Sequence, residues 1–444
     1  MNTKTALGTL CIGALSGGLT ACPGPEPAAF DCEDQAAAFE ASYKDDGVLL
    51  AEIPDRPSFP MAMVLSEQGI NNLLTGVVGG KVPFASKLSL GLIDIDFTPV
   101  SAPVISIVKV PNCSRCVLFS LDFDFQLKDG EDPSGAGSGY AEIAIPLRLQ
   151  QNEDGSSSLV AGYEAATVRR MDLNAMGFVF DADHFSNIQG AFEILSTEAL
   201  REQYGTTELL HFAPWTIGGN DVKLAAREFQ VFTDSKVISL GLQTNLDLPR
   251  SVSVHVGDKL PEGVPMVVQM HPGLLLGMSQ RMITEGEISR TYNDKGEPDP
   301  KGLYGVTLES LAPGGIEDSN QLEAGFRVWR TQDGYCGYAD AVTTLKVELG
   351  DADAITVTPT DDLRVTGGEG IGEIATSNQE LVDKNKKLVE RFKSDLSKQV
   401  GITINYKEVG VQGSTILFDT LALSVAQDAI EILIDFQVVA NEGG

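Results

Sequence analysis

The chain has 444 residues, of which 43% are hydrophobic and 21% charged, and its formal net charge is −30. The composition is that of a folded protein. The chain is longer than one ordinary hydrophobic core accommodates, so we expect two domains. The negative charge repels phosphate backbones and anionic surfaces, which argues against nucleic acid or a bare anionic bilayer as a partner.

The first residues are typical of a bacterial lipoprotein signal peptide. One basic residue, Lys4, precedes a short apolar stretch, and the segment ends in Leu19-Thr20-Ala21-Cys22, the pattern of a lipobox. The resemblance implies cleavage after residue 21 and a diacylglyceryl group on the sulfur of Cys22. Two or more acyl chains hold a protein on a membrane. We therefore expect a protein anchored through Cys22 in a bacterial cell envelope, in the outer membrane and facing the periplasm or the cell surface.

Residues 22–48 are rich in proline, alanine and acidic side chains. We interpret this segment as a lipidated tether, with one helical turn around Ala36 to Tyr43. A flexible coil of this length separates anchor and body by roughly 25 to 30 Å. The folded body is predicted to begin at residue 49.

Six cysteines occur in the chain; Cys11 leaves with the signal and Cys22 carries the lipid. The remaining four, in an exported protein, indicate disulfides with three possible connectivities. Cys113 and Cys116 lie between two strand-like segments, where they are interpreted as a loop disulfide, and Cys32 then pairs with Cys336 by elimination. A zinc site made of all four is the alternative, although the paired ligand spacing is missing.

One phrase occurs twice, as residues 60–78 and again 205 positions later as residues 265–283. Each copy begins with an apolar, extended stretch. Apolar residues then recur with helical spacing, which predicts an amphipathic helix in both copies. The apolar face carries Ile70, Leu73, Leu74 and Val77 in the first copy and Leu275, Met278 and Met282 in the second.

Long alternating strands follow the first copy. Phe123 and Phe125 alternate with acidic residues, and Ile145 and Leu147 share one face of the next strand. Strands with one polar and one apolar face are typical of antiparallel sheets. A second helix is then predicted in each half, over residues 185–199 and 381–396.

The last strands also repeat. Ile238, Leu240 and Leu242 correspond, 194 positions on, to Ile432, Ile434 and Phe436. Matches in the same order indicate a duplicated unit of about 195 residues. The predicted domains are residues 49–247 and 248–444, and the proline-rich segment over residues 246–265 separates them.

The order of elements resembles the tandem tubular lipid-binding (TULIP) superfamily, which includes bactericidal/permeability-increasing protein and lipopolysaccharide-binding protein. The resemblance covers residues 50–440 and is carried by VLSEQGINNLL, VVQMHPGLLLGMSQRMI and VQGSTILFDTLALSVAQDAIEILIDFQVV. It implies an α+β fold of two repeated units. In each unit a strongly curved antiparallel sheet wraps a long helix, and the units join end to end through a central sheet.

The same resemblance implies an apolar tube in each unit that takes lipid chains. Because the chain is acidic where the antimicrobial members are basic, we expect neutral or zwitterionic lipid, sterol or similar apolar cargo. The alternative is a non-catalytic structural or protein-binding envelope module with closed cores, since apolar periodicity alone cannot distinguish a lined tube from a filled core. The expected lining is Ile70, Leu73, Leu74, Val77, Phe123, Phe125, Ile145 and Leu147 in the first tube, and Leu275, Met278, Met282, Ile432, Ile434 and Phe436 in the second.

Motifs for catalysis do not stand out. The four histidines lack metal-ligand spacing, and no nucleophile elbow is present. Residues 75–82 resemble a phosphate loop, but Thr75 and Val82 occupy positions that such a loop needs for Gly and for Ser or Thr. We therefore expect no enzyme, no cofactor and no metal site.

Overall fold

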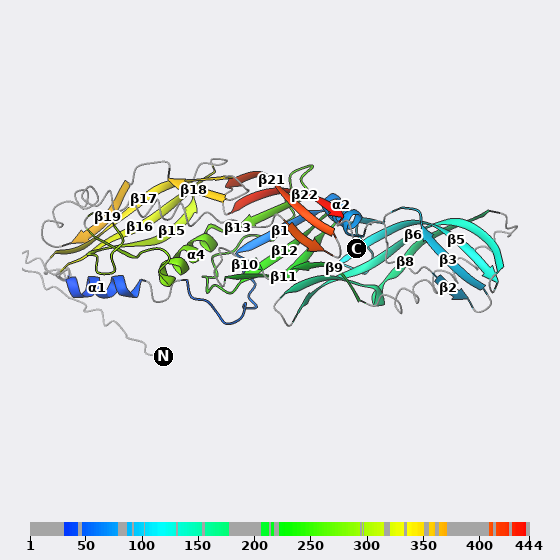
Figure 1. Cartoon of the computed structure of the whole chain (residues 1–444), viewed down its shortest axis with the longest axis horizontal. Coiled ribbons are helices and arrows are strands. Elements are labelled where there is room, and N and C mark those ends of the chain that lie inside the picture. Colours follow the sequence, from blue (N-terminus) through cyan, green and yellow to red (C-terminus); the bar gives the residue numbers. More distant parts are fainter. Residues whose placement is uncertain are drawn as a thin grey trace, which may run out of the picture.

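The structure is a computed structural model that describes residues 31–42, 47–78, 87–90, 93–101, 103–129, 132–152, 156–176, 206–212, 215–216, 222–293, 295, 297–314, 320–332, 335–349, 355–359, 364–370, 408–411, 414–425 and 429–440. These residues form an elongated molecule in which three sheets follow one another along the long axis (Figure 1). Within these ranges the α-helices are α1 (Cys32–Ala41), α2 (Glu67–Val78) and α4 (Pro272–Glu285). The described fold is therefore mostly β-sheet with few helices, consistent with the α+β prediction.

The middle sheet takes its strands from both halves of the chain. Its order is β10-β11-β12-β1-β13-β22-β21-β20, and the neighbours pair antiparallel. The strands are β1 (Met61–Ser66), β10 (Trp215–Thr216), β11 (Lys223–Phe232), β12 (Val237–Thr244), β13 (Met266–Met270), β20 (Glu408–Val411), β21 (Ser414–Val425) and β22 (Ile430–Ala440).

The other two sheets lie at opposite ends of the molecule (Figure 1). The sheet built from the first half has the order β2-β3-β5-β6-β7-β9, with β4 beside β5 and β8 beside β6. Its strands are β2 (Lys87–Leu90), β3 (Ile93–Pro99), β4 (Val104–Ser106), β5 (Cys116–Asp129), β6 (Asp132–Gln151), β7 (Ser157–Gly162), β8 (Thr167–Met176) and β9 (Thr206–Phe212), with a 3-10 turn at Tyr163–Ala165.

The sheet from the second half has the order β14-β15-β16-β17-β18, with β19 beside β17. Like the others it is antiparallel. Its strands are β14 (Thr291–Tyr292), β15 (Tyr304–Pro313), β16 (Gln321–Gln332), β17 (Tyr335–Leu349), β18 (Ile355–Pro359) and β19 (Arg364–Gly370).

The middle sheet has the same strand arrangement on both sides of its centre. The two copies of the repeated phrase form β1 and β13, which pair with each other, and Met63 lies opposite Val268. These two residues are 205 positions apart, so they are also equivalent in the repeat. An internal twofold relation within this sheet therefore passes between Met63 and Val268.

The register corrects the sequence alignment of the last strands by two residues. Leu240 lies opposite Met63, and Ile432 lies opposite Val268. Leu240 is therefore equivalent to Ile432, at an offset of 192, and not to Ile434. Side chains in a strand alternate with a period of two, so either alignment puts an apolar residue on the same face. The sequence pattern cannot distinguish them.

Helices α2 and α4 follow β1 and β13 directly, as the repeated phrase predicts. At the start of α2 the Ser66 hydroxyl accepts a hydrogen bond from the Gly69 amide (2.9 Å). At the start of α4 the Nδ1 atom of His271 accepts one from the Gly273 amide (2.9 Å). Such side chains satisfy amides that the first turn of a helix leaves unpaired.

The segment that connects the two halves, residues 247–265, contains no helix or strand and crosses one face of the middle sheet. Val254 and Val256 pack with Phe59 and Ala62 in a small buried cluster. The Val254 amide also donates a hydrogen bond to the Phe59 carbonyl (2.8 Å). The opposite face of β1 lies in the main core. Strand β1 is therefore covered on both faces, which accounts for its uninterrupted apolar sequence.

Helix α1 overlaps the helical turn predicted around Ala36 to Tyr43, and it changes the interpretation of this part of the tether as a flexible coil. Residues 31–42 are not a flexible coil, because α1 packs against β16 and β17. Phe39 is 4% exposed, and its ring centroid lies 5.8 Å from that of Trp329. The Cys32–Cys336 disulfide joins α1 to β17. One aromatic anchor and one covalent bond supply the stability that the composition of this segment lacks.

Both predicted cysteine pairings are present. Cys113 and Cys116 form a disulfide at the start of β5, and Cys32 and Cys336 form the second, across 304 residues of sequence. The two disulfides contain all four cysteine sulfurs that the alternative zinc site would need, so these sulfurs are not available as zinc ligands.

Beside α1, charged and aromatic side chains form a compact group on the sheet. Arg327 is ion-paired with Asp340 (2.6 Å), and its guanidinium carbon lies 4.3 Å from the Tyr338 ring centroid. The hydrogen bond from Arg327 to Asp340 raises the pKa of the guanidinium above its ordinary value. Burial raises the pKa of the Tyr338 hydroxyl. The group therefore keeps one ion pair and one neutral phenol beside α1.

Gly305 of β15 makes room for Phe39, which yields a first prediction. A Cβ atom at position 305 would lie 2.2 Å from Cε2 of Phe39. We expect Gly305→Ala to displace the ring and lower the free energy of unfolding by about 1–3 kcal/mol, measured by urea unfolding. Gly367→Ala in β19 is the control, because its nearest neighbour is an ordinary 3.6 Å contact. Equal stability of the two variants would contradict the tight packing of α1.

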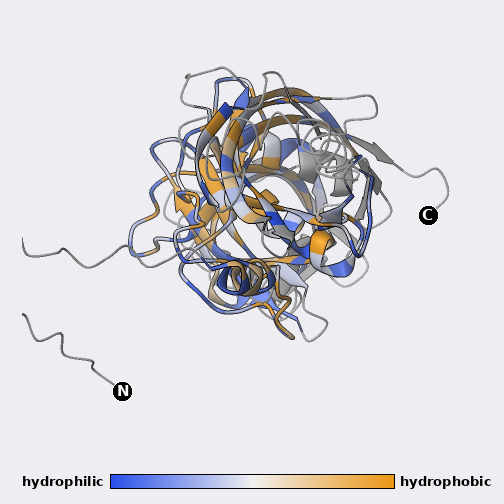
Figure 2. Ribbon diagram, turned by 90° about the vertical axis from the view of Figure 1, so that its left-hand side faces the viewer, coloured by the Kyte–Doolittle hydropathy of each residue, from blue (hydrophilic) through white to orange (hydrophobic). Residues whose placement is uncertain are grey.

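Buried apolar side chains from all three sheets belong to one continuous cluster, and smaller clusters lie beside it. Along the long axis, the strands curve around a common interior (Figure 2). The predicted helices over residues 185–199 and 381–396 lie outside the described residues. The wrapping of each sheet around a long helix therefore stays a prediction, as do the domain boundaries.

Candidate functional site

The residues predicted to line the first tube lie in the main core wherever their side chains are described. All five are nearly inaccessible to solvent: Ile70, Phe123, Phe125, Ile145 and Leu147. The side chains of Leu73, Leu74 and Val77 lie outside the described residues. The predicted apolar face of the sheet is thus present, with alternate residues such as Asp122 and Asp124 exposed.

Aromatic rings fill part of this face. Phe123 is 0% exposed, and its centroid lies 5.4 Å from that of Phe97 in an edge-to-face arrangement. Its centroid is 6.4 Å from that of Phe125. Ring contacts of this kind are typical of a packed core.

The second predicted lining occupies the same continuous cluster. Leu275, Met278, Ile432, Ile434 and Phe436 are buried, and Met282 is partly buried against them. The structure therefore brings both predicted sets into one apolar interior. Met278 and Met282 lie on α4, where unbranched thioether side chains can adapt to a change of shape.

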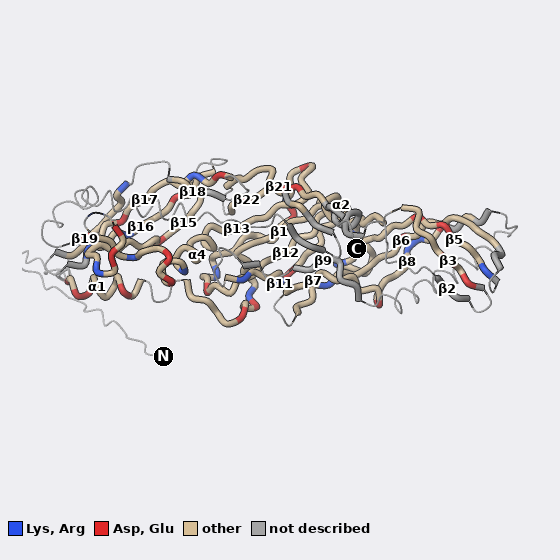
Figure 3. The backbone as a smooth tube through the Cα atoms, viewed as in Figure 1, with Lys and Arg blue, Asp and Glu red and all other residues tan. Residues whose placement is uncertain are grey.

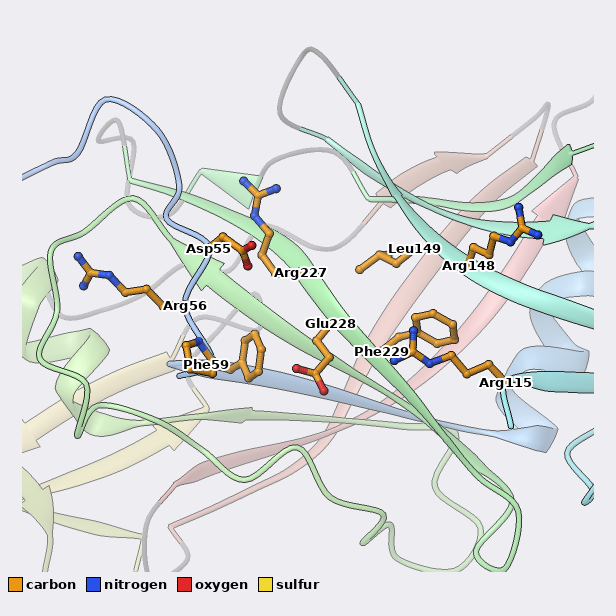
Figure 4. Close-up of a pocket in the computed structure, with 10 residues that line it drawn as sticks. Asp55, Arg56, Phe59, Arg115, Arg148, Leu149, Arg227, Glu228 and Phe229 are labelled. Carbon is orange, nitrogen blue, oxygen red and sulfur yellow. The ribbon is translucent and has the colours of Figure 1, made fainter. Parts of the chain in front are cut away.

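A pocket of about 680 Å³ lies at the junction of the middle sheet and the first-half end sheet (Figure 4). It was not predicted from the sequence. Its walls come from the segment before β1, the start of β5, the end of β6 and the middle of β11. The lining residues are Asp55, Arg56, Pro57, Phe59, Arg115, Arg148, Leu149, Arg227, Glu228 and Phe229.

Four of these ten residues are arginines, in a chain with 32 basic and 62 acidic residues. Elsewhere along the described chain, acidic and basic positions are interspersed (Figure 3). Two of the four arginines have carboxylate partners. Arg56 is paired with Asp247 (3.1 Å), and Arg148 is paired with Glu164 (2.8 Å).

Arg115 has a different environment. Its side chain is exposed, and its guanidinium carbon lies 4.9 Å from the centroid of the Phe229 ring. Within the described part of the chain, no carboxylate lies within ion-pair distance of it. Stacking on an aromatic face orients the guanidinium and leaves its N–H groups available to a ligand.

Arg227 owes its position to a β-bulge. The pairing of β11 with β12 shifts between Ala226 and Glu228, so Arg227 is the extra, unpaired residue. It donates hydrogen bonds to Gln151 and to the Ile53 carbonyl (3.2 Å). Its Nε atom is buried and makes no hydrogen bond. Bulges re-aim a side chain, and this one turns a cation toward the pocket.

The same bulge recurs in the second half of the middle sheet. There the pairing of β21 with β22 shifts between Thr420 and Ala422, so Leu421 is the extra residue. Arg227 and Leu421 are 194 positions apart, which is the offset between β11 and β21; β12 and β22 are offset by 192. Leu421 is 50% exposed. The backbone geometry therefore belongs to the repeat, whereas the arginine belongs to the first half alone.

The side chains of the pocket are suited to bind a negatively charged group. Its cations are arginines, which stay protonated and bind carboxylate or phosphate through a planar fork. Asp55 and Glu228 also line it, so the lining itself has four positive and two negative side chains. Phe59, Phe229 and Leu149 add an apolar surface. The sequence could not reveal the pocket, because its arginines are spread over more than 170 positions without a recurring spacing.

Among the described residues, no helix is long and apolar enough to cross a membrane. In the same ranges, no group of three or more His, Cys, Asp and Glu side chains is arranged to hold a metal ion.

Comparison with known proteins gives distant structural likenesses. No model of a known family matches the chain, and no curated protein matches it. The crystal structure of lipopolysaccharide binding protein is similar at 9% identity and a TM-score of 0.37, covering 86% of this chain and 99% of that one. P47 of Clostridium botulinum E1 is similar at 9% identity and a TM-score of 0.44, covering 87% and 99%.

P47 from Clostridium botulinum A2 is similar at 9% identity and a TM-score of 0.38, covering 86% of this chain and 97% of that one. At this identity and these TM-scores, the likenesses assign neither a family nor a function to the chain.

Proposed function

We propose that the protein is a membrane-anchored lipoprotein that binds or transfers lipid. Cys22 holds it in the outer membrane of a bacterial envelope, facing the periplasm or the cell surface. Lipid chains lie against the apolar inner faces of the curved sheets, and the function is non-covalent and needs no cofactor. Neutral or zwitterionic lipid, sterol or similar apolar molecules are the proposed cargo.

The observation that carries this proposal is the continuous apolar interior, to which all three curved sheets contribute. Transfer of a lipid chain from water to such a surface lowers its free energy by about 0.8 kcal/mol per methylene. A sixteen-carbon chain therefore gains up to roughly 12 kcal/mol before the cost of association is subtracted. Adaptable methionines such as Met278 and Met282 suit a wall that opens for different chains.

One observation favours the alternative, a structural or protein-binding envelope module with a closed core. Phe123 is fully buried and touches Phe97 and Phe125 ring to ring. At that point of the first-half sheet the interior is occupied by protein side chains. A carrier would have to accommodate lipid elsewhere in the interior or move these rings.

Lipid analysis separates the two functions. We expect residues 23–444, exported without Cys22 and purified without detergent, to release about one or two lipid molecules per chain on organic extraction, as counted by mass spectrometry. This form carries no acyl anchor, so neither the anchor nor bilayer lipid enters the count. Extracts that contain no lipid in stoichiometric amount would favour the closed module.

The anchor has its own control. Cys22→Ser removes the only sulfur that the predicted lipobox offers, so we expect this variant to leave the membrane fraction. A Cys11→Ser variant changes a cysteine within the signal and should fractionate as the unmodified protein does. Membrane association of both variants would contradict anchoring through Cys22, without bearing on the lipid count.

A further inference from the structure

The arginine pocket differs from the apolar interior in its chemistry. It is a concave site of about 680 Å³, within the usual size range of small-molecule sites. It combines cations with an apolar surface from Phe59, Phe229 and Leu149. A site of this kind suits a ligand with a charged group and a short apolar part.

We propose that this pocket binds an anionic group, a phosphate or a carboxylate, through Arg115, with Arg227 as the second cation. The proposal goes beyond lipid carriage, because the pocket would bind such a group whether or not the interior takes lipid. A free anion and the head group of an amphiphile are two sources of the same chemistry.

The first argument is the available hydrogen-bonding capacity. Arg115 is oriented by its stacking on Phe229 and has no carboxylate within ion-pair distance among the described residues. Arg227 lines the same pocket and is held in place by hydrogen bonds to Gln151 and to the Ile53 carbonyl, with no ion pair among the described residues. Arg56 and Arg148 are already ion-paired and serve as the positive surroundings.

The second argument is the local charge. At physiological ionic strength, charges farther than about 8 Å are largely screened when exposed, so the nearest side chains decide the potential. Figure 4 shows the Glu228 carboxylate directed away from the Arg115 guanidinium, whereas Asp55 lies beside Arg227. Arg115 is therefore the least compensated cation of the pocket. The chain's net charge of −30 does not prevent an anion from binding there.

The third argument is the asymmetry of the repeat. The bulge that presents Arg227 presents Leu421 at the equivalent position of the second half. The strand geometry does not require an arginine at the bulge, since leucine is accommodated there. A cation placed at one copy only, beside three other arginines, indicates a role in that half.

The test is isothermal titration calorimetry of the full mature protein with four soluble probes: hexyl phosphate, hexanoate, hexanol and inorganic phosphate. We expect at least one of the two anionic amphiphiles to bind with one-to-one stoichiometry, at least about tenfold more tightly than hexanol. Inorganic phosphate that binds as tightly as hexyl phosphate would identify a free anion as the source. Weaker binding of inorganic phosphate would identify an amphiphile.

Variants assign the binding to the pocket. Arg115→Gln should weaken the anionic probe at least about tenfold and leave hexanol unchanged. Arg227→Leu should act in the same direction and should fold, because Leu421 occupies the equivalent bulge. Arg364→Gln is the matched control; this side chain is 72% exposed, pairs with Glu323 and lies in the sheet at the other end of the molecule. Its binding should equal that of the unmodified protein.

Three results would overturn the proposal: no binding of either anionic amphiphile, equal binding of hexanol, or Arg115→Gln binding as tightly as Arg364→Gln. None of them depends on the lipid count. A closed module would still bind these short probes, and a carrier without this site would release lipid on extraction yet fail the titration.

Discussion

The Phe123→Ala variant is expected to lose about 3–5 kcal/mol of its free energy of unfolding, in the range for a large aromatic side chain removed from a packed core. Phe123 is 0% exposed and touches two other rings. Removal of the ring loses the favourable free energy of its transfer out of water. It also leaves a cavity that Phe97 and Phe125 can only partly fill. Urea unfolding followed by far-ultraviolet circular dichroism measures the loss.

Val104→Ala in the same sheet is the matched control. Val104 is 51% exposed, so its truncation should change stability by no more than about 0.5 kcal/mol. A loss for Phe123→Ala that stays within about 1 kcal/mol of this control would contradict a filled core at this position. It would instead indicate that the ring borders an open slot, which favours lipid carriage over the closed module.

Removal of the Cys32–Cys336 disulfide by double substitution with serine is expected to cost about 2–5 kcal/mol. The bond links residues 304 positions apart. In the chain-entropy account, a longer closed loop restricts the unfolded chain more, so this bond lies at the upper end of the range. Thermal unfolding without reductant measures the difference, and limited proteolysis should then release the segment around α1.

The second disulfide provides the comparison within the same protein. Cys113 and Cys116 close a loop with a separation of only three residues. Their double substitution with serine should cost about 2 kcal/mol or less by the same account. A larger loss than for the Cys32–Cys336 pair would mean that local packing, and not loop length, governs the two effects.

The strands and the two helices of the repeated phrase could be predicted, because their periodicity is local. In β5 the alternation of Phe123 and Phe125 with acidic residues fixes which face is buried. The two-residue error at Leu240 has the same origin, since a pattern with a period of two is unchanged by that shift. Register depends on pairing between distant strands, and only the structure supplies it.

The docking of helix α1 on the sheet and the arginine pocket could not be predicted, for a different reason. Phe39 becomes a core residue only because the sheet presents Trp329 and Gly305 offers space. Arg115 and Arg227 line one pocket because the residue before β5, the end of β6 and the middle of β11 all border it, and no spacing in the sequence indicates this arrangement. Features made by tertiary contact between distant segments leave little trace in a single sequence.

The docked position of α1 also limits how an anchored molecule could stand. Cys22 and Cys32 are ten residues apart, and an extended chain covers at most about 3.6 Å per residue. The segment that connects them therefore spans no more than roughly 36 Å. It starts from the tip that carries β16 and β17 (Figure 1). A protein anchored through Cys22 would thus be attached at one end of its long axis, and the end that carries the first-half sheet would be free to move away from the membrane.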